Sequence, residues 1–321
     1  MSDVVAPKKS FRRVLSVDGG GIRGIIPAMV IAHIEKRMGQ PAHELFDLMV
    51  GTSTGGILAL GLSRPGSGRD AQFSARRVVK LYEEQGDKIF EYSLWRKLRT
   101  VGGFLDEAYS HEVLEGILGA YFSGATLADC EVPTMVTSYD IQNRSTVFLK
   151  SWHAHHQQLL CRDAARATSA APTYFEPKPL DTGDVVGVLI DGGIFMNSPS
   201  VSAYAEARKL FPDDPIAVLS LGTGELTRPI PFEEARSWGS ALWVMSLLDC
   251  MFDGVSKAAD HQMRLFLGER YQRLQTSLVT ASDDIDDASK ENIGNLKKIA
   301  RELIKQNEMA LEQFFAMEST E

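Results

Sequence analysis

A serine between two glycines is the first residue pattern in this sequence that could do chemistry. Ser53 lies in Gly-Thr-Ser-Thr-Gly, of the form G-x-S-x-G, with Gly51 and Gly55 at its ends. A serine hydroxyl attacks an ester carbonyl when a nearby base accepts its proton. The glycines permit a tight strand-to-helix turn that holds the serine at the head of a helix, where free N–H groups favour a developing negative charge. Alone, the pattern fits a nucleophile or an ordinary tight turn.

A base for Ser53 has to come from elsewhere in the chain, and Asp191 is the leading candidate. It follows a predicted strand, residues 185–190, and precedes Gly192 and Gly193. Two glycines allow close approach of another segment, so Asp191 and Ser53 could form a direct catalytic dyad. In the alternative interpretation Asp191 is a turn residue that accepts hydrogen bonds from nearby backbone N–H groups.

A glycine cluster at Gly19, Gly20 and Gly21 lies between the first predicted strand and the first predicted helix. Exposed backbone N–H groups at such a place can stabilise the oxyanion of an acyl-transfer reaction. Arg23, two residues further on, would add positive charge to the same region. We therefore expect these four residues to form an oxyanion hole.

The same cluster also matches a dinucleotide-binding pattern, because Gly19, Gly21 and Gly24 satisfy G-x-G-x-x-G. That site requires an acidic residue at the end of the second strand, to bind the ribose. Here Asp47 lies at the start of that strand, and G-x-S-x-G occupies its end. The pattern alone therefore favours a nucleotide site only weakly.

The elements that must position these residues alternate between strand and helix. Apolar runs and turn residues predict strands at 14–17, 46–50, 132–136, 146–149, 185–190 and 216–221, and helices at 25–34, 42–45, 57–62, 74–85, 111–122, 160–171 and 200–210. Such alternation predicts an α/β fold of three layers, with a mostly parallel central sheet and helices on both faces. Ligands bind beyond the carboxyl ends of such strands, so the three polar turns should meet at one edge.

For domain organisation, we expect a disordered lead-in at 1–10 and a single catalytic domain at 11–321. Its motif-bearing core is 11–224, and 225–321 is predicted to be helical. The first ten residues lack the apolar segment of a signal peptide. The apolar run at 240–252 is interrupted by Asp249 and is too short to span a membrane.

Composition excludes some classes of function. A formal net charge of -8 argues against binding to a nucleic-acid polymer, which requires a basic surface. The three cysteines, Cys130, Cys161 and Cys250, lie far apart in apolar surroundings and are predicted to be buried reduced thiols, typical of a cytoplasmic protein. Their spacing indicates no metal site, and no cofactor is expected.

Two histidine patterns offer alternatives. Ser53, Asp191 and His261 occur in the chain order of an α/β-hydrolase triad, but the sequence around His261 predicts the interior of a helix, so a surface or packing role is favoured. His153, His155 and His156 could bind a metal, although no cysteine or pair of carboxylates accompanies them and a solvated loop is favoured.

Taken together, the motifs resemble those of the patatin-like phospholipases. The family's DGGGxRG, GxSxG and DG[GA] motifs appear complete and in order at 18–24, 51–55 and 191–193. The stretches 165–175 and 220–224 are also similar to plant patatins and their bacterial relatives. The resemblance covers residues 11–224.

The resemblance implies a calcium-independent lipid acyl hydrolase that uses a Ser-Asp dyad and an acyl-enzyme. Ser53 would be the nucleophile and Asp191 the base, with oxyanion donors around Gly20 and Gly21. Asp18 is expected to anchor the glycine loop. Substrates would be membrane phospholipids, lysophospholipids or galactolipids. Some bacterial relatives are effectors activated by a signalling nucleotide, and no residue here decides for or against such a regulatory ligand.

A lipid substrate implies peripheral contact with a membrane, and two stretches could provide it. Residues 89–105 mix Trp95 and other aromatics with basic side chains, and 238–252 is apolar with Trp243. Ordinary core packing is the alternative for each stretch, and is favoured.

Overall fold

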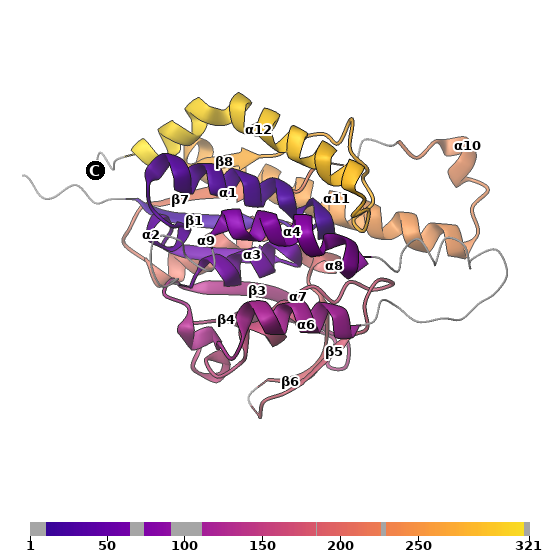
Figure 1. The fold of residues 1–321 in the computed structure, drawn as a ribbon, viewed down its shortest axis with the longest axis horizontal. Helices are drawn as coiled ribbons and strands as arrows, with labels where there is room; N and C mark the ends of the chain where they lie inside the picture. The colour runs from indigo at the N-terminus through magenta and orange to yellow at the C-terminus, as the bar shows by residue number, and fades with distance from the viewer. Residues whose placement is uncertain (1–10, 65–73, 91–110, 184, 226–228, 318–321) are drawn as a thin grey trace, which may run out of the picture.

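The fold is built on one eight-stranded mixed sheet with helices on both faces, as the sequence predicts (Figure 1). The structure, a computed structural model, describes residues 11–64, 74–90, 111–183, 185–225 and 229–317. The strand order is β5-β6-β3-β2-β1-β7-β8, and β4 pairs with β3. The strands are β1 (Arg12–Val17), β2 (Leu48–Thr52), β3 (Thr134–Asp140), β4 (Ser145–Lys150), β5 (Lys178–Asp181), β6 (Val186–Asp191), β7 (Ile216–Leu221) and β8 (Tyr271–Leu274).

The helices of the described chain enclose this sheet. The α-helices are α1 (Ile25–Met38), α2 (Ala42–Leu45), α3 (Thr54–Leu62), α4 (Ala75–Phe90), α6 (His111–Phe122), α7 (Cys161–Thr168), α8 (Gly193–Met196), α9 (Ser200–Leu210), α10 (Phe232–Ala235), α11 (Ser240–Leu267) and α12 (Lys290–Ala316). Short 3-10 helices are η1 (Gly21–Gly24), η2 (Leu127–Asp129), η3 (Ala154–His156) and η4 (Gly268–Arg270).

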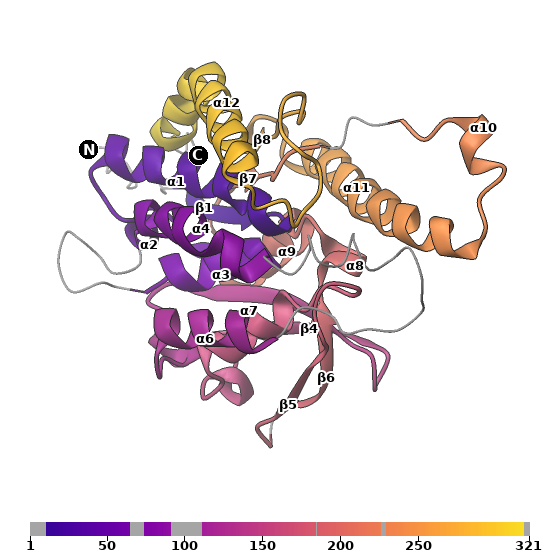
Figure 2. The same cartoon turned by 45° about the vertical axis from the view of Figure 1, so that its right-hand side comes forward.

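The central strands bury both of their faces, because side chains alternate along a strand. In β1, Leu15 and Val17 pack into a core formed with α1, α3, α4 and α12. Val14 faces the other way and packs with residues of α9 and α11. Figure 2 shows α12 and α1 side by side, and the contacts between them agree. The three layers are therefore helices, sheet and helices.

Two strands of the sheet, β5 and β8, are not predicted from the sequence. β5 contains Pro179, and a proline within a run argues against a strand except at the edge of a sheet, which is where β5 lies. β8 is a four-residue strand at the opposite edge and includes the charged Arg273. The expectation that 225–321 is helical throughout is therefore wrong at β8, although α11 and α12 supply most of that region.

Three parallel strands bring their following loops to one edge of the sheet. Val17 at the end of β1 lies in register with Gly51 of β2 on one side and Leu221 of β7 on the other. Because these strands end level with one another, the glycine loop after β1 lies beside the serine turn after β2.

Asp191 lies at the same edge of the sheet, although its strand runs in the opposite direction. β6 runs antiparallel to β3, and Asp191 pairs with Ser138 of β3. The preceding residue of β3, Thr137, pairs with Thr52 at the end of β2. β4 pairs with one edge of β3 along this whole stretch. β2 and β6 therefore both pair with the other edge of β3, one after the other, and their ends meet. The ends of these two strands therefore face each other where Ser53 begins the turn.

Some sequence predictions fall on residues that the structure does not describe. The expected lead-in at 1–10 and the part of the aromatic stretch at 91–105 lie outside the described residues. Among the helices that are described, none combines the length and apolar character that crossing a membrane requires.

Candidate active site

Ser53 lies on the sharp turn between β2 and α3 that the G-x-S-x-G pattern predicts. Its backbone has a φ of 55°, in the left-handed region that non-glycine residues seldom occupy. A Cβ at Gly51 would overlap the carbonyl oxygen of Gly55, and a Cβ at Gly55 would overlap that of Val17. Both glycines are thus required by the packing of the turn against itself and against β1.

The turn is fixed in place by a threonine of α7. The backbone N–H of Ser53 donates to Thr168 Oγ1 over 2.9 Å. Thr168 Oγ1 donates in turn to the carbonyl oxygen of Thr137, over 2.6 Å. Thr168 is fully buried, so this connection ties the serine turn to α7 and β3.

Asp191 meets the side chain of Ser53 in a buried environment. Its side chain is 2% exposed, and Asp191 Oδ1 accepts a hydrogen bond from the backbone N–H of Gly193 over 2.7 Å. Burial raises the pKa of Asp191 to about 6, while hydrogen bonds from Ser53 and Gly193 oppose the rise. The carboxylate therefore stays ionised at neutral pH and is more basic than an ordinary aspartate, which suits a general base.

The glycine loop after β1 is held from three sides. Arg273 of β8 forms a buried bidentate ion pair with Asp18, at 2.9 and 2.5 Å. Thr223 Oγ1 donates to the carbonyl oxygen of Gly19 over 2.6 Å, and the N–H of Gly19 donates to the carbonyl oxygen of Asn197 over 3.0 Å. Asp18 thus anchors the loop, and the N–H of Gly19 is already occupied.

The next two glycines of the loop keep their N–H groups available. Within the described part of the chain, the N–H groups of Gly20 and Gly21 donate to no protein acceptor. Both residues line the same pocket as Ser53 and Asp191. Arg23 is buried and its Nε donates to the carbonyl oxygen of Gly20 over 3.3 Å. The N–H groups of Gly20 and Gly21 are thus placed where they can donate to an oxyanion formed in this pocket.

The rest of this pocket is largely apolar. Its walls include aliphatic and aromatic side chains from α3, α4, α6 and the segment after α7. These are Ile57, Tyr82, Ile89, Leu114, Ala171, Tyr174 and Phe175. An apolar wall beside Ser53 is suited to a hydrocarbon chain.

The histidines lie elsewhere. His261 is on the exposed side of α11, and no histidine is among the described residues that line the pocket of Ser53. The rings of His155 and His156 each lie against that of His153 in a tilted arrangement, and His156 Nδ1 accepts a hydrogen bond from the backbone N–H of Lys150. No group of three or more His, Cys, Asp or Glu side chains suited to a metal occurs in the described residues.

The acidic residue considered for a dinucleotide site is engaged elsewhere. The Asp47 carboxylate accepts hydrogen bonds from the side chain of Arg12 and from the backbone N–H of Arg13. It lies at the opposite end of the sheet from the glycine loop, beside the start of β1 rather than its end. The structure thus offers no ribose contact at this residue.

Several supporting residues were not singled out from the sequence. Thr54 is the first residue of α3, and its N–H has no acceptor within that helix. Its position directly after the elbow serine is a usual place for an oxyanion donor and could have been read from the motif. Asn197 and Arg273 carry no such sequence signal, since their role depends on distant segments.

Comparisons with known proteins agree with the motifs. The family model described as "Patatin-like phospholipase" matches residues 15–204. The chain is 31% identical to Patatin-like protein 2 of rice, Oryza sativa, over 92% of this chain and 84% of the relative. It is 33% identical to a cGAMP-activated phospholipase of Pseudomonas aeruginosa, over 80% of this chain and 76% of the relative. The solved structure of human GIVD cytosolic phospholipase A2 aligns at a TM-score of 0.46 and 13% identity, covering 98% of this chain and 60% of that one.

The family match spans more than half of the chain, from β1 into α9, and includes both Ser53 and Asp191. This chain therefore belongs to the patatin-like phospholipase family.

Proposed function

We propose that this chain is a calcium-independent lipid acyl hydrolase that cleaves fatty acyl esters of membrane lipids through a Ser53–Asp191 dyad. One observation carries the proposal. The hydroxyl of Ser53, held on a strained turn, contacts a buried carboxylate of raised pKa beside two free N–H groups. Membership of the family supports the substrate class, since its members include phospholipases.

The mechanism follows from these positions. Asp191 accepts the proton of Ser53 Oγ as that oxygen attacks the ester carbonyl. The N–H groups of Gly20 and Gly21 donate to the resulting oxyanion, and each such donor is typically worth about 10²- to 10³-fold in rate. Protonated Asp191 then gives its proton to the departing alcohol. Asp191 then takes a proton from a water molecule as that water attacks the acyl-enzyme, and gives the proton to Ser53 Oγ as the fatty acid is released.

Contact with a membrane would use α11, which extends away from the sheet (Figure 2) and contributes Phe252 to the lining of the pocket. Trp243 and Leu247 are 43% and 51% exposed, and Cys250 and Met251 are exposed on the same helix. The favoured expectation of core packing is therefore wrong for Trp243 and Leu247, and the prediction of a buried thiol is wrong for Cys250. We propose that these side chains rest at the lipid surface.

Product analysis tests this function. Purified protein is incubated with phosphatidylcholine, phosphatidylethanolamine or galactolipid vesicles in buffer containing EGTA, and products are identified by mass spectrometry. We expect free fatty acid and the lysolipid to accumulate at the same rate with EGTA or with calcium. A strict requirement for calcium, or release of phosphorylated headgroup instead of fatty acid, would contradict the proposal.

The raised pKa of Asp191 predicts the pH dependence of activity. The base must be ionised to accept the proton, so kcat/KM should fall about tenfold per pH unit below an apparent pKa of about 6 and reach a plateau above it. Initial rates on a soluble ester such as p-nitrophenyl butyrate, between pH 4.5 and 8.5, measure this directly. Activity recovered at pH 8 after incubation at each pH separates ionisation from unfolding. A profile that is flat down to pH 4.5 would exclude Asp191 as the base.

His261 supplies the test of a triad. Because His261 is exposed on α11 and absent from the pocket, His261→Ala should keep kcat/KM within about twofold of wild type. The matched control is His43→Ala, which changes a histidine on α2, far from the pocket. A loss of 100-fold or more for His261→Ala, with His43→Ala unaffected, would replace the dyad with a triad.

Activation by a nucleotide is a second candidate property. It is favoured by similarity to a relative named a cGAMP-activated phospholipase. If the chain requires such an activator, ester hydrolysis should be low alone and rise on addition of a cyclic dinucleotide, with a rise in melting temperature. Full activity without any nucleotide would reject it.

A further inference from the structure

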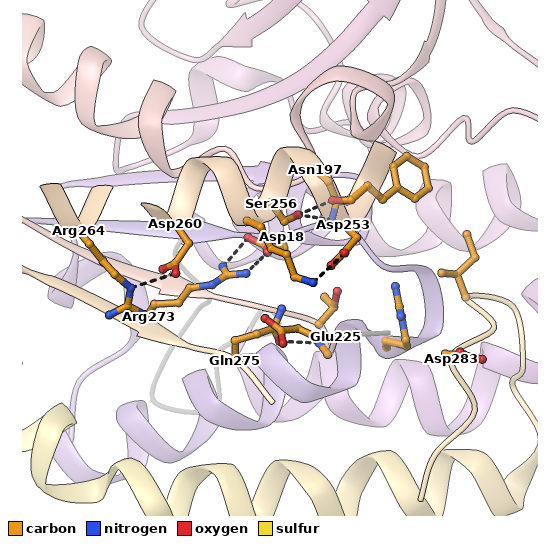
Figure 3. A pocket seen from close by; sticks show the side chains of 16 residues that line it. Asp18, Asn197, Glu225, Asp253, Ser256, Asp260, Arg264, Arg273, Gln275 and Asp283 are labelled. Atoms are coloured by element: carbon orange, nitrogen blue, oxygen red, sulfur yellow. Dashed lines mark hydrogen bonds and ion pairs between the residues drawn. The ribbon is translucent and has the colours of Figure 1, made fainter. Parts of the chain in front are cut away.

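A second cavity adjoins the pocket of Ser53 and differs from it in character. Its volume is about 180 Å³, room for more than a single water molecule. The two cavities share Arg23, Asn197, Phe252 and Ile285 in their walls. The second cavity lies between α11 and the segments that follow β7 and β8 and is lined mainly by polar and charged side chains (Figure 3). An ester held at Ser53 therefore has a polar compartment next to it.

The charges of this cavity are mostly neutralised in pairs. Ion pairs join Arg273 to Asp18, Lys257 to Asp253 and Arg264 to Asp260. Glu225 is different. Among the described residues, its carboxylate accepts no hydrogen bond and lies in no ion pair within 4 Å, although Glu225 is only partly exposed. Among the described residues, the Glu225 carboxylate therefore has no cation in direct contact.

The surroundings of Glu225 favour a cation. Glu225 is close enough to Lys257 to contribute to raising the pKa of that amine, after the larger effect of the hydrogen bond from Lys257 to Asp253. The Lys257 ammonium group therefore lies near two carboxylates, those of Asp253 on α11 and of Glu225 in the segment after β7. Phe252 belongs to the wall that the two cavities share, and the edge of its ring lies close to Gly193.

We propose that this cavity binds the ammonium group of a zwitterionic phospholipid headgroup, with Glu225 as its counter-ion. The inference rests on the proposed acyl hydrolase function and names its preferred substrates, which are lipids with ethanolamine or choline headgroups. Asp253 supplies a second carboxylate if Lys257 turns away. Binding in this cavity places the headgroup on one side of the shared wall and the ester at Ser53 on the other.

Two substitutions should change headgroup preference in opposite directions. Glu225→Gln removes the counter-ion and should lower kcat/KM for dioleoyl phosphatidylethanolamine about tenfold relative to dioleoyl phosphatidylglycerol. Lys257→Met removes the competing amine and should raise the same ratio. Both variants should cleave p-nitrophenyl butyrate, which has no headgroup, at the wild-type rate. Assays use mixed micelles with EGTA, so that bound calcium cannot occupy the acidic site.

The matched control is Glu44→Gln, which removes an exposed carboxylate from α2, away from the cavity. Equal losses on both lipids for Glu225→Gln, or a lower ratio for Lys257→Met, would overturn the proposal. A binding measurement tests the headgroup site separately from the proposed hydrolase function. Calorimetry with a short-chain diether phosphoethanolamine, below its critical micelle concentration, should show about tenfold weaker binding by Glu225→Gln than by wild type. Unchanged binding would refute the site even if hydrolysis is observed.

Discussion

Replacing Ser53 with alanine is expected to lower kcat/KM for ester hydrolysis by about 10⁴- to 10⁶-fold, the usual cost of removing a catalytic nucleophile. Two other hydroxyls that line the described pocket are engaged away from Asp191: Ser169 Oγ donates to the carbonyl oxygen of Ala165, and Thr54 Oγ1 is hydrogen-bonded to Tyr82. Rates of fatty acid release from vesicles and of p-nitrophenol release from a soluble ester both measure the loss.

The fold should survive this change. Alanine and serine have a similar preference at the φ of 55° found here, and the N–H that donates to Thr168 Oγ1 is retained. An unchanged melting temperature would show this. Ser237→Ala is the matched control, because it removes an exposed hydroxyl from the segment after α10. If Ser53→Ala retains more than about 1% of wild-type activity, Ser53 is not the nucleophile.

Asp191→Asn is expected to reduce kcat/KM by about 10²- to 10⁴-fold, the range that general base catalysis contributes. Asparagine has nearly the same shape and can still accept the hydrogen bond from the N–H of Gly193, but it cannot take the proton of Ser53. The residual activity should also lose the pH dependence centred near 6. A variant that keeps the wild-type pH profile would show that another group titrates.

The same substitution should stabilise the protein at pH 8. The folded-state pKa of about 6 lies above the unfolded value of about 3.9, so the ionised carboxylate costs folding free energy above pH 6, and that cost vanishes below pH 4. Removing the charge should recover about 1–3 kcal/mol at pH 8, after allowing for the lost hydrogen bond with Ser53, and raise Tm by several degrees. Thermal melts at pH 8 measure this. A lower Tm for Asp191→Asn would mean that the hydrogen bonds to the Asp191 carboxylate stabilise the fold by more than burial of its charge costs.

Much of the site could be predicted because its residues lie at strand ends that have strong local signals. Continuous apolar runs indicate buried parallel strands, and the glycines around Ser53 indicate a turn without room for side chains. These patterns depend on neighbouring residues in the sequence. The fold class and the elements that carry Ser53 and the glycine loop follow from them.

Relations between distant segments could not be predicted. An apolar run such as β6 does not reveal whether it lies parallel or antiparallel to its neighbour, yet its direction is what brings Asp191 to the end of β2. Arg273 is a charged residue in a short segment, and only its pairing with Asp18, 255 residues away, makes it a buried strand residue. The exposure of Trp243 similarly depends on α11 extending beyond the helices it packs against.

The most direct test of the dyad is covalent labelling. Protein treated with a fluorophosphonate at pH 8 is digested, and the modified peptide is identified by mass spectrometry, for wild type, Ser53→Ala, Asp191→Asn and His261→Ala. We predict one adduct, on Ser53, in wild type and His261→Ala, a greatly slowed reaction in Asp191→Asn and no adduct in Ser53→Ala. Labelling of a different residue, or Asp191→Asn reacting as fast as wild type, would contradict a nucleophile activated by Asp191.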